Sequence, residues 1–171
     1  MKSRIIVLCL VVVTFLGFAV GKAALYAAPS SDFDVKAGNV QPRQLEEATQ
    51  AAISREYSQA WQNLVQALRD NRVDLLQENF VGVAKDKFTA QIEKQKAAGI
   101  STNLVDRGHK VEVLFYSPEG SAIQFRDTAS FDMQLLEGGK VIHTEKLEMQ
   151  YVGLITVTGD RWKVRVLQSA K

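Results

Sequence analysis

The 171-residue sequence contains one cysteine, two histidines and three prolines. Cys9 lies in an apolar run near the N-terminus, so the rest of the chain has no thiol for a disulfide or a cysteine metal site. His109 and His143 are far apart and have no clustered carboxylates beside them, so we expect no metal site and no cofactor. The folded part must be stabilised by its hydrophobic core alone, for which about 130 residues are enough.

Outside the N-terminal segment the chain has no excess of positive charge. Three of the 21 basic residues (Lys2, Arg4 and Lys22) lie in residues 1–29, which hold no acid; the remainder has 18 basic and 19 acidic residues, a net charge of −1. A protein that binds nucleic acid by neutralising phosphates needs a basic folded domain, so we exclude nucleic acid as a partner. The sequence also lacks a glycine-rich phosphate loop and a serine in a nucleophile elbow.

An unbroken apolar run, residues 5–21, follows the basic start formed by Lys2 and Arg4. This layout is typical of a secretory signal or a signal-anchor, which leaves cleavage or retention of residues 1–28 open. If residues 5–28 are retained, they anchor the protein in the membrane. Both interpretations hold the N-terminus in the cytoplasm. The rest of the chain is therefore predicted to be exported, as a membrane-anchored, periplasmic or secreted domain.

Residues 29–42 have no apolar period and are predicted to form a linker, followed by one domain over residues 43–169. A long amphipathic helix is predicted from an apolar stripe at helical spacing: Leu45, Ile53, Tyr57, Trp61, Leu64 and Leu68. A short second helix is expected from Val73 to Gly82. A third is expected from about Ala84 to Ala98, with Gly99 as the residue that ends it.

After Ser101 the apolar period becomes two, as in strands, with turns at residues 117–120, 137–139 and 158–160. Four strands in sequence predict an antiparallel meander. The expected fold class is therefore α+β: an N-terminal apolar helix, then three helices packed on a curved four-stranded antiparallel sheet, a cone-shaped roll.

This pattern resembles the nuclear transport factor 2-like superfamily over roughly residues 43–169. The resemblance rests on the first helix with Tyr57 and Trp61, the helix ending at Gly99-Ile100, the meander, and the last strand with Trp162. It implies a cone-shaped fold. The superfamily includes ketosteroid isomerase, polyketide cyclases and scytalone dehydratase, and also non-enzymatic periplasmic assembly domains, so it does not select a function.

Polar residues on the inward face of the sheet are the candidates for chemistry. A three-residue loop at residues 137–139 would pair Leu136 with Lys140, which places Asp127 and His143 on the inward face. Asp127 is then the candidate general base, with Tyr151 or Tyr57 as hydrogen-bond donor. The alternative is a structural Asp127 paired with Arg126, Arg107 or a backbone amide. The candidates for lining a ligand pocket are Tyr57, Trp61, Phe125, Met149 and Tyr151.

Two functions remain open on the sequence. The favoured one is an exported, membrane-tethered binding or assembly domain without catalysis, because no catalytic pair can be mapped onto the enzymes of the superfamily. The second is a small pocket enzyme of the isomerase or dehydratase type that uses Asp127 as its base. The partners left open are a protein, a small apolar ligand, or a second copy bound through the sheet.

Overall fold

The computed structural model describes residues 33–38 and 40–170. The predicted signal peptide or membrane anchor of residues 1–28, with its apolar helix, lies outside these described residues. Within the described part of the chain, no helix combines the length and the apolar composition needed to span a membrane.

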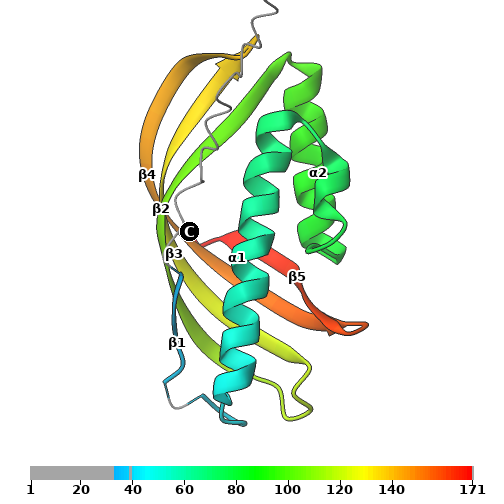
Figure 1. Cartoon of the computed structure of the whole chain (residues 1–171), viewed down its shortest axis with the longest axis vertical. Coiled ribbons are helices and arrows are strands. Elements are labelled where there is room, and N and C mark those ends of the chain that lie inside the picture. Colours follow the sequence, from blue (N-terminus) through cyan, green and yellow to red (C-terminus); the bar gives the residue numbers. More distant parts are fainter. Residues whose placement is uncertain (1–32, 39, 171) are drawn as a thin grey trace, which may run out of the picture.

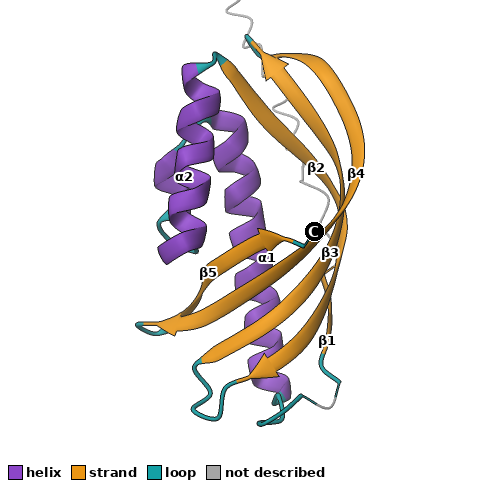
Figure 2. Cartoon of the chain, turned by 180° about the vertical axis from the view of Figure 1, so that it is seen from behind, coloured by secondary structure: helices purple, strands orange, loops and turns teal. Residues whose placement is uncertain are grey.

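Two α-helices and a 3₁₀ turn pack on one five-stranded sheet. The elements follow one another as β1 (Phe33–Lys36), α1 (Glu47–Asp70), η1 (Val73–Leu76), α2 (Gly82–Ala97), β2 (Ile100–Tyr116), β3 (Ala122–Glu137), β4 (Lys140–Thr158) and β5 (Arg161–Ser169). The sheet order is the sequence order. Strands β2 to β5 are antiparallel, and β1 is parallel to β2. The sheet bends around both helices, which lie on the same face of it (Figures 1 and 2).

The predicted arrangement of three helices on a four-stranded antiparallel meander is wrong. The expected second helix is the four-residue turn η1, and the sheet is mixed because β1 adds a parallel fifth strand. Strand β1 lies inside the segment predicted as a linker. Its four residues are too few to show a recognisable alternation, and it is positioned by pairing with β2 rather than by its own propensity.

Helix α1 buries the face that the apolar stripe predicts. Ile53, Tyr57, Trp61, Leu64 and Leu68 are all buried. The helix ends at Asn71, which adopts a left-handed conformation with φ of 53°. The Asn71 side-chain amide donates a hydrogen bond to the carbonyl of Ile100 at the start of β2.

The free edge of β5 is partly covered by the chain between η1 and α2. The Val164 amide donates to the Asn79 carbonyl, and the Val81 amide donates to the Val164 carbonyl. Arg161 at the start of β5 pairs with Glu56 of α1 at 2.8 Å and also with Glu78. These contacts fix β5 against the helices.

The long strands bend at irregular positions of the ladder. The register shifts between Asp106 and Gly108, between Val113 and Phe115, between Leu135 and Leu136, and between Leu154 and Ile155. Extra residues of this kind bend a strand and increase its twist. The bent sheet leaves space against the helices, and the candidate site lies there.

Candidate functional site

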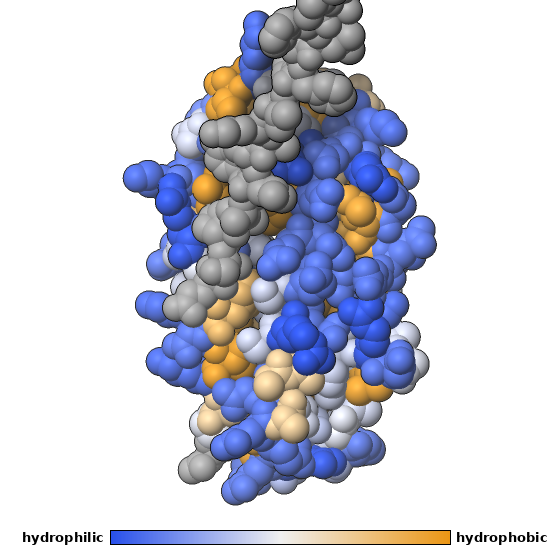
Figure 3. Space-filling model, viewed as in Figure 1, coloured by the Kyte–Doolittle hydropathy of each residue, from blue (hydrophilic) through white to orange (hydrophobic). Residues whose placement is uncertain are grey.

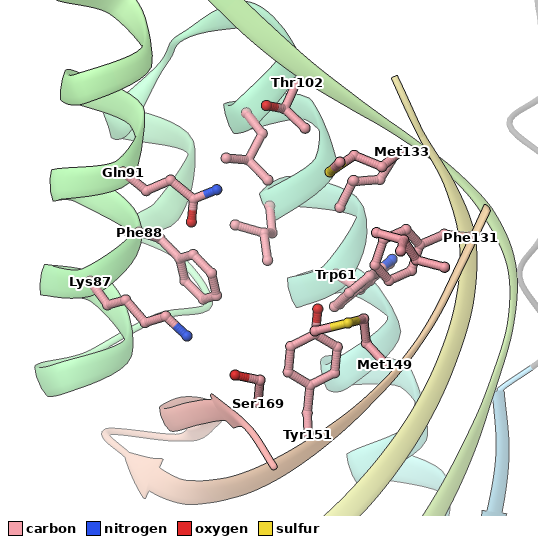
Figure 4. Close-up of a pocket in the computed structure, with 14 residues that line it drawn as sticks. Trp61, Lys87, Phe88, Gln91, Thr102, Phe131, Met133, Met149, Tyr151 and Ser169 are labelled. Carbon is pink, nitrogen blue, oxygen red and sulfur yellow. The ribbon is translucent and has the colours of Figure 1, made fainter. Parts of the chain in front are cut away.

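A cavity of about 230 Å³ opens between the two helices and the inner face of the sheet (Figure 4). Its wall is largely apolar. Helix α1 contributes Trp61, Leu64 and Leu68, α2 contributes Phe88, and the strands contribute Leu104, Phe131, Met133, Leu147, Met149 and Tyr151. A space of this size and lining suits an aliphatic or aromatic group.

A few polar side chains also line the cavity: Lys87 and Gln91 on α2, Thr102 on β2, and Ser169 at the end of β5. The Lys87 ammonium donates to the carbonyl of Leu167 at 3.1 Å, and Figure 4 shows its tip directed toward Ser169. Tyr151 lies on the wall formed by β4. Burial raises the pKa of the Tyr151 hydroxyl, and the nearby charge of Asp127 raises it further, so this group stays protonated.

A buried polar network lies between α1 and the inner face of the sheet, beside the cavity. The Tyr57 hydroxyl donates to Asp127 Oδ2 at 2.7 Å. The same oxygen lies 2.7 Å from Nδ1 of His109, whose other nitrogen, Nε2, lies 3.2 Å from Asp106 Oδ2. The exposed fraction of Asp127 is 0% and that of His109 is 2%. The network thus joins α1, β2 and β3.

His109 is held between two carboxylates, and both of its ring nitrogens can donate only when the ring is protonated. Burial opposes the charged form, but the hydrogen bonds and charges of Asp106 and Asp127 outweigh it and raise the pKa of His109 above its usual value. Burial also raises the pKa of Tyr57 well above its ordinary value, and Asp127 adds to this effect. His109 is therefore a cation below its ordinary pKa of about 6.5, and Tyr57 is a neutral donor.

Aromatic rings enclose His109. The ring of Phe33 on β1 stacks on it at 4.1 Å between centroids, with 8° between the planes. Trp61 meets it edge-on at 4.5 Å. Phe33 also contacts Tyr57 edge-on at 5.6 Å. The short strand β1 therefore covers the network.

The structure places the predicted site residues in three different environments. Trp61, Met149 and Tyr151 line the cavity. Tyr57 and Phe125 are buried in the core and form no part of the cavity wall. Asp127 is buried in the network, but its partners are Tyr57 and His109 rather than Arg126, Arg107 or a backbone amide.

His143 lies away from all of these groups, in the exposed part of the β3–β4 hairpin. Its side chain is 58% exposed and lies 3.9 Å from Glu145. The prediction paired Met133 with His143, whereas the structure pairs Leu135 with His143. The loop contains two residues rather than three, and a bulge at Leu135 shifts the register once more.

His109 was not predicted as a member of the network. It lies opposite Ala129, one position along the inner face from the Val111–Asp127 pair. Finding it would have required the register of β2 against β3, which the irregularity between Val113 and Phe115 shifts by one residue. The pattern of alternation does not reveal such a shift.

The cavity can hold an apolar group, and the polar network of Tyr57, Asp127 and His109 lies beside it.

Asp127 Oδ1 has no hydrogen-bond partner within the part of the chain that the structure describes. Among these described residues, no three His, Cys, Asp or Glu side chains are grouped so that they could hold a metal ion.

No protein-family model matches the chain, and no curated protein matches it. Among solved structures it is similar to the intermembrane-space region of the chloroplast protein ARC6, with a TM-score of 0.64 and 14% identity, over 74% of this chain and 98% of that one. It also matches a de novo designed β-sheet protein solved by NMR, with a TM-score of 0.34 and 16% identity over 68% and 85% of the two chains. The first of these similarities shows that the fold also occurs in ARC6.

Proposed function

We propose that the chain is an exported binding or assembly domain whose cavity receives an apolar group of a protein partner. The observation that carries this proposal is the cavity of about 230 Å³ between the helices and the sheet. Its apolar wall favours burial of an aliphatic or aromatic side chain of the partner. The polar groups of Lys87, Gln91 and Ser169 can form hydrogen bonds that orient the partner's backbone next to that side chain.

The position of Asp127 supports binding over catalysis. A general base must reach the proton that it removes, either directly or through one water. Asp127 is fully buried, lies outside the cavity wall, and already accepts hydrogen bonds from Tyr57 and His109. The pocket-enzyme alternative therefore has less support than a structural role for this carboxylate.

The location proposed for this domain rests on residues 1–28. The apolar run behind Lys2 and Arg4 supports export. The intermembrane-space region of ARC6, which shares the fold, is consistent with a domain that works outside the cytoplasm. Membership of the nuclear transport factor 2-like superfamily and a homodimer through the sheet stay predictions.

Site-specific photo-crosslinking in intact cells tests the binding function. A photoreactive residue in place of Gln91, which is exposed and lines the cavity, should capture a partner protein. The same residue in place of Gln62, exposed on α1 outside the cavity wall, should not.

Filling the cavity should then abolish the adduct. Met133→Trp adds a bulky ring to the cavity wall, and Val152→Trp adds the same ring on β4 outside the cavity wall. We expect the adduct at Gln91 to disappear with Met133→Trp and to persist with Val152→Trp. An adduct that Met133→Trp leaves unchanged would contradict the proposal.

A further inference from the structure

The tip of the β3–β4 hairpin presents aliphatic side chains to solvent. Val141 and Ile142 are 50% and 53% exposed, and only Lys140 separates them from the two-residue loop of Gly138 and Gly139. Both glycines have positive φ, as a tight hairpin turn requires. Figure 3 shows hydrophobic surface at this end of the molecule. Adjacent exposed aliphatic residues at a protruding tip are typical of a contact surface.

The direction of β1 relates this tip to the N-terminal segment. Strand β1 runs parallel to β2, with Phe33 opposite His109. Strand β2 begins at Ile100, which pairs with Glu137 beside the hairpin loop. The N-terminal end of β1 therefore points toward the hairpin tip (Figure 1).

The lengths agree with this direction. The nine residue-to-residue steps from Ile100 to His109 rise about 30 Å at the usual strand spacing. Residues 22–32, between the apolar run and β1, span at most about 40 Å when fully extended. When β1 is perpendicular to the bilayer that holds residues 5–21, about 30 Å of this span is needed to reach the level of the hairpin tip. At most about 10 Å then remains between the tip and the bilayer.

We propose that the β3–β4 tip, formed by residues 138–142, contacts the surface of the bilayer in which residues 5–21 are embedded. Val141 and Ile142 enter the boundary between head groups and acyl chains. Lys140 lies beside them, and its long side chain can keep its ammonium at the level of the lipid phosphates. The membrane is thus contacted at two points, the anchor and the hairpin.

The test uses the full chain, reconstituted in vesicles of phosphatidylcholine and phosphatidylglycerol. A spin label is attached at Ile142→Cys in a Cys9→Ser background, and the matched control carries the label at Glu119→Cys. Glu119 is exposed in the turn between β2 and β3, at the opposite end of the sheet. Relaxation by oxygen, which concentrates in lipid, is compared with relaxation by a water-soluble nickel chelate.

We expect the oxygen-to-nickel ratio at position 142 to exceed that at position 119 several-fold, and the two ratios to become equal when detergent replaces the vesicles. Adding Val141→Ser to the Ile142→Cys variant, which removes the neighbouring aliphatic group, should lower the ratio at position 142. Equal ratios in vesicles, a higher ratio at position 119, or failure of the chain to float with the vesicles would each overturn the proposal. Since none of these readouts involves the cavity, failure here is distinct from failure of the proposed binding function.

Discussion

Asp127 is the residue on which the interior of the molecule depends most. A single carboxylate oxygen, Oδ2, accepts from the Tyr57 hydroxyl and faces Nδ1 of His109, so it joins α1 to β2 and β3. A charge removed from water is tolerated only where such partners compensate for the lost hydration. The network therefore stabilises the fold only while all its members are present.

Replacing Asp127 with asparagine should destabilise the protein. Asp127→Asn keeps the size of the side chain but leaves the His109 cation without its closest counter-charge. We expect the free energy of unfolding near pH 6 to fall by about 3 kcal/mol, as for other broken buried ion pairs. Urea denaturation measures this loss. The control is Asp132→Asn, which breaks a surface pair with Arg107 and should have a much smaller effect. If Asp127→Asn raised stability instead, Asp127 would be a candidate functional acid.

The raised pKa of His109 predicts a dependence of stability on pH. A histidine whose folded-state pKa exceeds its unfolded value binds protons more tightly in the native state. Its contribution is complete below about pH 6.5 and is lost as the pH rises through the folded-state pKa. The urea midpoint of the wild-type protein should therefore fall as the pH rises above about 6.5. His109→Gln should remove most of this slope, and a slope that is the same in both proteins would contradict the assignment.

Among the elements, the close contact between β3 and β4 leaves no room for a side chain at Gly153 of β4. Phe125 lies opposite Gly153, and a Cβ atom on Gly153 would lie 2.2 Å from the Phe125 ring. The ring, which is 1% exposed, also packs edge-on against Tyr57 with centroids 4.7 Å apart. Because Gly153 has no side chain, the Phe125 ring of β3 can lie over β4 and also pack against Tyr57 of α1.

Gly153→Ala should lower the free energy of unfolding by about 1–3 kcal/mol, because the Phe125 ring has to move within a packed core. Gly38→Ala is the matched control, since a Cβ there meets no atom within 4 Å. It should leave stability nearly unchanged. Adding Phe125→Leu to Gly153→Ala should recover part of the loss. Equal effects of the two alanine substitutions in thermal melts would show that the Phe125 contact does not constrain β4.

The elements also show where sequence patterns succeed and fail. The spacing of Ile53, Tyr57 and Trp61 predicts the buried face of α1, because a helix has one fixed period. The register between strands has no such signal. Beyond the bulge at Leu135, each residue of β3 pairs with a residue of β4 two positions further along the chain than predicted, so Asp127 faces Tyr151 rather than Met149. A shift by two preserves the face, which is why Asp127 was still placed inward.

At the scale of the whole molecule, the two ends of the sheet differ. One end carries the β3–β4 hairpin, in which every residue from Glu137 to Lys146 is exposed. The other carries the beginning of α1 and the turn at residues 117–120. The cavity lies between the ends, so a partner can reach it while the hairpin end faces a membrane. Trp61, Met149 and Tyr151 were predicted from the sequence as pocket residues, and they line the cavity. The extent of the cavity and the polarity of the molecule could not be predicted, because both depend on how far the sheet bends.

Export of the whole domain is tested by protease access. The apolar run behind Lys2 and Arg4 predicts that residues 30–171 lie outside the cytoplasmic membrane. Protease added to spheroplasts should digest this part of the chain and spare a cytosolic marker. Replacing Leu8 and Val12 with arginine should prevent export, because charged residues within the apolar run oppose insertion, and should protect the domain. Equal protection of the unmodified domain and the marker would contradict the predicted topology.

The parallel pairing of β1 has a mechanical consequence. A pull on the chain upstream of Phe33 acts along the axis of β1, so the four residue pairs with β2 are loaded together, in shear. Residues 37–46 then lie between β1 and α1 and are not loaded while β1 holds. A sufficient force detaches β1 from β2 and separates Phe33 from His109. Only then is the force transmitted to the helices. A tethered domain under tension therefore uncovers its buried histidine while the sheet from β2 to β5 remains assembled.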